Sequence, residues 1–469
     1  MNKALNSLLP MFGWSPDRLG ELDITGPMDP VLPTSFRVTE TSVATLSAIG
    51  LAVNDLWKLR TGRHQRVTLN TRHATASLRS TGYIKVDGKT KPPKTGVMGM
   101  FPTKDGHWYY VHANFPHHRA AALKVLGATE DREAVVKAIA QRDAFELEEA
   151  VLAAGGAGGM VRSMEEWAKH PQSAAIASLP MIEIIKIGEA PPEALPAGDR
   201  PLSGIRVLDL TRVVAGPVGT RTLAEHGADV LRITSPHLPH IDMQELETGH
   251  GKLSAKIDLR QPADVEKLRE LVRESDVFCQ GYRPGTIASH GFSPEELAKL
   301  RPGIVAISLS AFSHAGPWAE RRGFDTAVQA TSGIAWRQGQ LFPIGGPGPQ
   351  FYPVSTIDYL VGHLLAVGAM VALKRRATEG GSWLVRTSLA QVGKWLVDQG
   401  EVPESELKGI PSEFTPEELA SWMTTTQCPA GLVQHFSPIL GLSETPPRWD
   451  RPSVPVGHHP AVWPARPAR

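Results

Sequence analysis

Asp358 is the residue whose position best suits chemistry in this sequence. It follows a loop rich in Pro and Gly and opens a long apolar segment, Asp358–Arg376, that we predict to be a helix, with Gly362 four residues further on. A carboxylate must be ionised to act as a nucleophile, and the N-terminus of a helix favours the anionic form. The same position also suits a helix cap, which stabilises a helix by about 1 kcal/mol without any chemistry. Spacing alone therefore leaves a nucleophile and a cap as alternatives.

Other reactive side chains give weaker signals. His107 and His112 bound an expected strand, on which they would point to opposite faces, so no metal site is expected. The pair His117-His118 is expected in a loop without partner spacing. Cys279 falls inside an expected strand, where it would be a small buried hydrophobic residue. Two cysteines cannot form a disulfide framework, and they indicate a reducing, cytoplasmic setting.

The stretch Pro201–Thr234 provides the scaffold for such a site. Ile205–Leu210 is expected to be a buried strand; a helix follows Ala215, and Ala228–Ile233 is a second strand. A βαβ unit indicates a parallel sheet that binds ligands at the carboxyl ends of its strands. The dinucleotide fingerprint G-x-G-x-x-G is absent. Strands and helices then alternate to about Val397, which predicts an α/β, doubly wound, Rossmann-like sheet.

Three pieces of this stretch, P-L-x-G-x-x-V-L-D, A-G-P and L-A-x-x-G-A-x-V, stand at the spacing found in class III CoA-transferases. The sequence resembles this family, which includes formyl-CoA transferase, carnitine CoA-transferase and α-methylacyl-CoA racemase. Gly251–Leu259 and Asp325–Gly333 match two further family segments. The resemblance implies the class III fold with a smaller α+β domain. It also implies coenzyme A and acyl-CoA as substrates, with no tightly bound cofactor.

The resemblance implies roles for individual residues. Asp358 would be the family aspartate that attacks the acyl-CoA thioester and forms a mixed anhydride. Arginines would meet the CoA phosphates and a tyrosine would stack on adenine. The implied CoA contacts are Arg212, Ala215, Ile257, Arg260 and Tyr282.

Phe324 separates two activities within the family. Racemases resembling this chain carry a histidine there and pair it with the later aspartate as acid and base across an α-carbon. Phenylalanine cannot transfer a proton, so we expect a CoA transferase that moves CoA from an acyl-CoA to a carboxylic acid. An acyl-CoA racemase or epimerase remains one alternative. The other is a non-catalytic CoA-binding or scaffold protein, since serines, Val214 and Gly281 replace some family CoA ligands.

The chain resembles a fusion of two truncated family units. Residues 1–195 resemble the back half of a unit, with a small-domain-like segment at about 85–185 and an irregular arm at 1–35. Residues 196–396 resemble the Rossmann-like front half with the nucleophile, and 397–469 form a Pro-rich C-terminal tail. The linker Glu189–Arg200 is short, so we expect one apolar core and a pocket wall supplied by residues 1–195.

The first half offers no clear second nucleophile. Asp358 lies eighteen residues before Arg376, and eighteen residues before the corresponding Arg60 stands Ser42, with Glu40 the nearest acid. One active centre is therefore expected, and the alternative is that Glu40 serves.

Composition limits the possible partners. The 469 residues carry a net charge of +1, which gives no reason to expect nucleic acid or an anionic membrane. We see neither a signal peptide at the start nor an apolar run of about 18 residues. A cytoplasmic protein with small-molecule substrates, which could form a homodimer, is expected.

Overall fold

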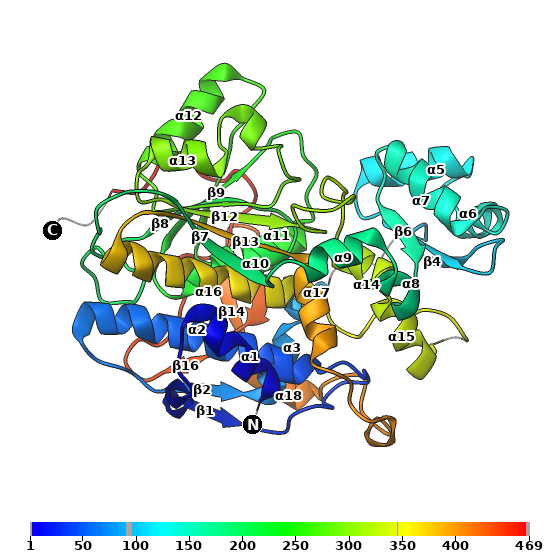
Figure 1. The fold of residues 1–469 in the computed structure, drawn as a ribbon, viewed down its shortest axis with the longest axis horizontal. Helices are drawn as coiled ribbons and strands as arrows, with labels where there is room; N and C mark the ends of the chain where they lie inside the picture. Colours follow the sequence, from blue (N-terminus) through cyan, green and yellow to red (C-terminus); the bar gives the residue numbers. More distant parts are fainter. Residues whose placement is uncertain (1, 91–95, 345, 466–469) are drawn as a thin grey trace.

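A seven-stranded sheet lies at the centre of the computed structural model, which describes residues 2–90, 96–344 and 346–465 (Figure 1). Its strand order is β10-β9-β8-β11-β12-β13-β7; all neighbours are parallel except β7, which runs antiparallel to β13. The strands are β7 (Ile182–Gly188), β8 (Arg206–Leu210), β9 (Asp229–Thr234), β10 (Lys252–Lys256), β11 (Val277–Gln280), β12 (Val305–Ser310) and β13 (Ser382–Ser388). This order reverses direction between β8 and β11, which confirms the doubly wound α/β fold and marks the binding crevice.

Helices cover both faces of this sheet. Helices α12 (Pro262–Arg273) and α13 (Pro294–Leu300) lie on one side, and α10 (Ala215–Glu225) and α16 (Thr356–Glu379) on the other (Figure 1). Glycine lets α10 and α16 approach closely, because a Cβ on Gly362 would lie 2.6 Å from the Ala215 carbonyl oxygen. The crossing places the second turn of α16 beside the first turn of α10.

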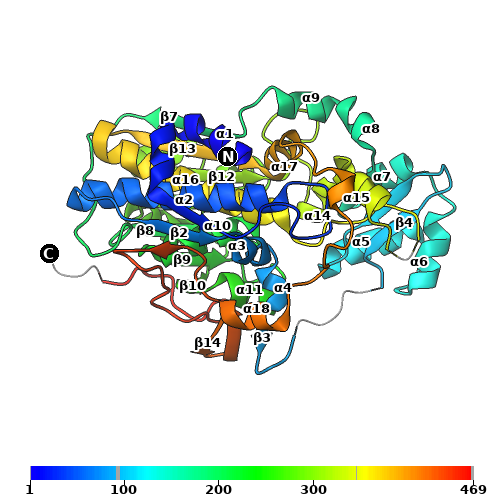
Figure 2. The same ribbon diagram turned by 90° about the horizontal axis from the view of Figure 1, so that it is seen from below.

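Helix α16 is the central helix of the core. It is the one helix of the described residues with the length and hydropathy of a membrane span, and 94% of that window is buried inside the protein. The expectation that no apolar run reaches such a length was wrong. The run is apolar on all sides because the sheet covers one face and α2 (Val38–Thr61) covers another (Figure 2).

The first half is built into this core. Its strand β7 forms the edge of the large sheet, so the proposed boundary after residue 195 separates two strands of one sheet. One apolar core contains buried residues of both halves, which confirms the expected shared core; Leu8, Ile49 and Leu51 join Val207, Leu360 and Val385 in it.

The expected irregular arm at 1–35 is wrong. It holds α1 (Lys3–Phe12), the 3₁₀ helix η1 (Pro16–Glu21) and β1 (Leu22–Thr25). Asn2 caps α1 by accepting the Leu5 N–H, and five apolar side chains of α1 are buried: Ala4, Leu5, Leu8, Leu9 and Phe12. Pro10 inside the helix hides this pattern in the sequence.

One arrangement of a helix and three strands occurs twice. Strand β2 (Val67–Asn70) pairs in parallel with β1 and antiparallel with β16 (Gly441–Leu442), just as β13 pairs with β12 and β7. Helix α2 precedes β2 as α16 precedes β13, and both helices have 24 residues. They lie side by side, with Thr45 Oγ1 3.0 Å from His363 Nδ1.

A small α+β region stands to one side of the large sheet (Figure 1, cyan). It contains β4 (Gly99–Pro102), β5 (Trp108–Val111), β6 (Gly158–Val161), α5 (Pro116–Leu126), α6 (Arg132–Ile139) and α7 (Ala144–Ala153). Helices α8 (Met164–Ala168) and α9 (Pro171–Ala177) lead back to β7.

The remaining elements connect these parts. A third small sheet joins β3 (Lys85–Val86) to the hairpin β14 (Met423–Cys428) and β15 (Gly431–Phe436) of the C-terminal segment. The other helices are α3 (Thr71–Ser77), α4 (Ser80–Tyr83), α11 (Asp242–Thr248), η2 (Ala288–His290), α14 (Asp325–Thr331), α15 (Ile334–Leu341), α17 (Leu389–Asp398), η3 (Glu404–Glu406) and α18 (Pro416–Trp422).

Candidate active site

Asp358 is the third residue of α16 rather than its cap. Ser355 holds the N-cap position without a side-chain capping bond, and the Asp325 carboxylate accepts the Asp358 N–H at 3.0 Å. The half-buried Asp358 carboxylate has no hydrogen bond or ion pair within the described residues. The cap interpretation is therefore wrong, and the carboxylate is available for chemistry.

Asp325, the first residue of α14, links α14 to the start of α16. Its buried carboxylate also accepts a hydrogen bond from the Gln329 side chain, whose carbonyl oxygen accepts the Tyr352 N–H at 3.3 Å. Burial, together with the Asp325 carboxylate beside it, raises the pKa of Asp358 well above its usual value. A carboxylate with a raised pKa is a more basic, stronger nucleophile once it is ionised, which suits acyl transfer.

Elements of the first half border this end of α16. The Leu78 carbonyl accepts the Ser355 N–H at 3.0 Å, and Ser80 Oγ lies 2.7 Å from the Tyr359 hydroxyl. On the small region, the Tyr110 hydroxyl lies 2.7 Å from Thr326 Oγ1, next to Asp325. Residues of the first half thus contact both α14 and α16 close to Asp358.

Backbone strain marks the turns that follow β8 and β12. Val213 has φ +71° between β8 and α10, and Ser313 has φ +90° after β12. A β-branched residue rarely adopts this left-handed conformation, and such strain clusters at functional sites. Neither left-handed position is a glycine, so no sequence pattern indicates these turns.

Cationic side chains gather at the crevice between β8 and β11, and we call Arg212, Arg283, Arg322 and His117 the cationic cluster. Burial and the guanidinium groups of Arg212 and Arg322 lower the pKa of His117, and burial and Arg283 lower that of Arg322. Within the described residues, no carboxylate lies within 4.0 Å of these three arginines. The cluster therefore has positive charge that the protein does not neutralise.

Two histidines that are expected in a loop lie in a helix instead. His117 and His118 lie in the first turn of α5, and Arg212 lies over the ring of Phe115, the N-cap residue, at 5.5 Å. Burial, His117 and the neighbouring arginines lower the pKa of His118 to about 4. A helix N-terminus with adjacent cations favours anions.

The predicted CoA contacts separate into two groups. Arg212 and Tyr282 come together at the crevice: burial raises the pKa of the Tyr282 hydroxyl, and the neighbouring Arg212 opposes that shift. Ala215 begins α10 in the adjacent turn. Ile257 is instead buried in the core after β10, and exposed Arg260 pairs with Asp258 at 2.8 Å.

Other predicted features have clear places. Cys279 is buried in β11, and burial raises the pKa of its thiol, as expected for a packing residue. Phe324 stacks on His112 with ring centroids 3.9 Å apart. The residues that the structure describes contain no group of three side chains that could hold a metal ion.

Comparison with known proteins shows which family the second half of the chain resembles. Residues 202–413 match the model of CoA-transferase family III, and they include the large sheet from β8 onward, the three arginines of the cationic cluster and Asp358. The chain is similar to this family over that segment. This match and the relatives described next support an enzyme of the CoA-transferase kind.

Three relatives illustrate the similarity. The acetyl-coenzyme A transferase nodX of Hypoxylon pulicicidum is 28% identical over 84% of this chain and 74% of its own length. An acyl-CoA transferase of Gibberella moniliformis is 27% identical over 91% of this chain and 87% of its own. The acetyl-CoA:oxalate CoA-transferase of Acetobacter aceti is 35% identical, over 40% of this chain and 51% of its own length.

Proposed function

We propose that this protein is a class III CoA-transferase that moves CoA from an acyl-CoA to a carboxylic acid through an anhydride on Asp358. The observation that carries the proposal is that one aspartate caps the start of α16 and a different one is available to the substrate. Asp325 accepts the Asp358 N–H at 3.0 Å, so the Asp358 carboxylate is left for the substrate. The similar enzymes that act on acetyl-CoA and oxalate support acyl-CoA and carboxylate substrates.

The reaction balances without another reactant. The ionised Asp358 oxygen attacks the thioester carbon, the C–S bond breaks, and CoA leaves as a thiolate. The acceptor carboxylate then attacks the aspartyl carbon of the anhydride and displaces the donor acid. The CoA thiolate attacks the acyl carbon of the acceptor, which forms the new thioester and returns Asp358 to a carboxylate.

The cationic cluster is our proposed site for the CoA phosphates. Its arginines have no carboxylate partner in the described residues and lie where doubly wound sheets bind ligands. Arg212 can make charge-assisted hydrogen bonds to phosphate oxygens, and Tyr282 beside it can stack on adenine. Arg260 contributes less, because Asp258 already neutralises it.

A racemase would require a second base near Phe324. His112 stacks on Phe324, and His118 has its ring centroid 5.7 Å away, so imidazole groups of the small region do lie nearby. This observation keeps racemisation as the second candidate. Incubation of a 2-methylacyl-CoA in D₂O tests it: transfer alone gives no α-deuterium, whereas enzyme-dependent exchange would favour the racemase.

Trapping of the anhydride tests the main proposal. The protein is incubated with a set of acyl-CoAs and hydroxylamine, and peptides are examined by mass spectrometry. A hydroxamate should form on Asp358 of the wild type and of the control Asp242→Asn, whose exposed aspartate also begins a helix. Label elsewhere, or transfer activity in Asp358→Asn, would refute the assignment.

A further inference from the structure

Glu40 occupies in α2 the position that Asp358 occupies in α16. Each is the third residue of a 24-residue helix, and the contact between Thr45 and His363 aligns the two helices in this register. The alignment through Arg60, which pointed to Ser42, was therefore wrong by two residues.

Asp29 accepts backbone N–H groups at the start of α2, as Asp325 does at the start of α16. Its carboxylate oxygens accept the N–H groups of Thr39 and Glu40 at 2.9 and 2.8 Å, as Asp325 accepts that of Asp358. Burial, with a smaller contribution from Glu40, raises the pKa of Asp29 to about 6. Two carboxylates thus meet at a helix start in both copies of the arrangement.

The Glu40 carboxylate, unlike that of Asp358, already has a hydrogen bond and an ion pair within the protein. Its Oε1 accepts the Ala4 N–H at 3.1 Å, and its Oε2 lies 3.7 Å from the Arg37 guanidinium. The first turn of α1 therefore covers one Glu40 oxygen, and Arg37 neutralises much of the remaining charge. These contacts argue against Glu40 as a second nucleophile.

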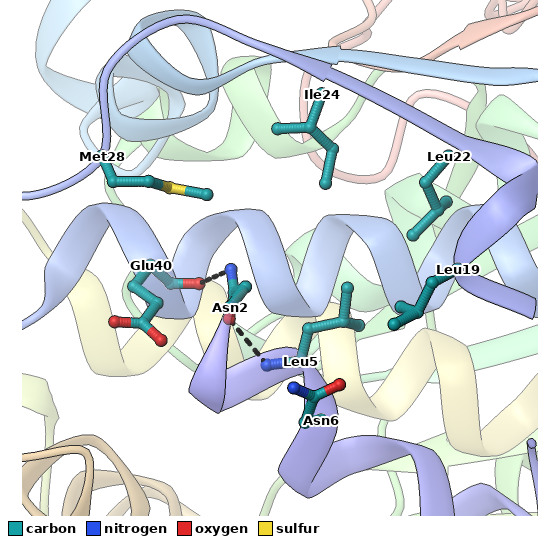
Figure 3. A pocket seen from close by; sticks show the side chains of 8 residues that line it. All are labelled: Asn2, Leu5, Asn6, Leu19, Leu22, Ile24, Met28 and Glu40. Atoms are coloured by element: carbon teal, nitrogen blue, oxygen red, sulfur yellow. Dashed lines mark hydrogen bonds between the residues drawn. The ribbon is translucent and has the colours of Figure 1, made fainter. Parts of the chain in front are cut away.

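A cavity of about 520 Å³ lies beside Glu40, within the usual size range of small-molecule sites. Figure 3 shows the side chains of the β1 segment facing those of α1 across it. Five lining side chains are apolar and three are polar: Leu5, Leu19, Leu22, Ile24 and Met28, with Asn2, Asn6 and Glu40. Met28 is 40% exposed, so apolar surface is left open to solvent here.

We propose that this cavity binds a small uncharged aliphatic molecule with a terminal hydroxyl group. The apolar side chains suit the hydrocarbon part. The Asn6 side chain has no hydrogen-bond partner within the described residues, and Glu40 Oε2 can accept a hydrogen bond from a hydroxyl group. An acid would place its carboxylate against that of Glu40, and Arg37, the ion-pair partner of Glu40 among the described residues, is already engaged by Glu40. The proposal does not depend on the anhydride chemistry at Asp358.

The test compares 1-hexanol with hexanoate, which share chain length and differ in the head group. Ligand-detected NMR on the full chain should show hexanol binding at least tenfold more tightly than hexanoate, also in the presence of saturating CoA. Met28→Trp should reduce hexanol binding at least tenfold by filling the cavity. The matched control Met11→Trp should leave it unchanged, because Met11 is equally exposed at 40% but lies outside the cavity.

A charge change provides an independent check. Glu40→Gln keeps an acceptor for the Ala4 N–H and removes the negative charge, so hexanoate should bind at least threefold more tightly than to the wild type. Equal binding of hexanol and hexanoate to the wild type would overturn the proposal. Wild-type hexanol binding in Met28→Trp would overturn it too, as would displacement of hexanol by CoA.

Discussion

Replacement of Asp358 by asparagine should separate chemistry from stability. The amide cannot form the anhydride, so transfer should fall by a factor of about 10⁴ or more. No cap is lost, because Asp325 still accepts the N–H of residue 358. The variant also loses the repulsion between the carboxylates of residues 358 and 325. Two unit charges 4 Å apart at an effective dielectric of 20 repel by about 4 kcal/mol, which is an upper limit. We expect the free energy of unfolding to rise by an amount on the order of 1 kcal/mol. For a protein of this size that is a Tm rise of about 1–2 °C.

The gain should depend on pH with a definite sign. The folded protein raises the pKa of Asp358 above its unfolded value of about 4, so the wild type loses stability as pH rises above that value. Asp358→Asn has no such loss. Thermal unfolding should therefore show the variant melting higher than the wild type at pH 8 and at the same temperature near pH 4. A lower Tm for the variant at both pH values would show that Asp358 stabilises the helix start, and would refute the reasoning.

Three further changes test the site and its scaffold. Asp325→Asn removes the neighbouring charge and keeps the hydrogen-bond acceptor, so the acid limb of the kcat/KM profile should move to lower pH; an unmoved limb would contradict the coupling of the two carboxylates. Arg212→Gln should raise KM for the acyl-CoA about tenfold and leave KM for the acceptor acid unchanged. The control Arg260→Gln should change either KM less than about twofold, because Asp258 already pairs with Arg260. Equal effects of the two variants would argue against the cationic cluster as the phosphate site. Gly362→Ala places a Cβ 2.6 Å from the Ala215 oxygen and should cost about 2 kcal/mol or more, measured as a fall in Tm, while the control Gly20→Ala, with nothing within 4 Å, should not.

The main sheet could be predicted from the sequence because its signals are local. Val207 and its neighbours in β8 form a short apolar run, and Gly227 ends the helix before β9, so strand and helix alternate visibly. Asp358 could be placed at a helix start for the same reason.

The structure of the site was less accessible, because its decisive contacts join distant segments. Asp325 lies 33 residues from Asp358, and His117 comes from the other half of the chain. Neither pairing has a spacing that a sequence pattern can reveal. The strain at Val213 is equally hidden, since left-handed backbone is usually announced by glycine.

Strand β7 constrains the order in which this protein can fold during synthesis. It leaves the ribosome before every other strand of the large sheet, yet its hydrogen-bonding partner β13 begins almost 200 residues later, at Ser382. At translation rates of about 5–20 residues per second, β7 waits on the order of ten seconds or more with an open edge. Helix α2 waits still longer for the apolar face of α16. Contacts between segments this distant in sequence form slowly, and apolar surface and unpaired strand edges stay exposed until they do. The yield of native enzyme should therefore depend on chaperone supply and on growth temperature.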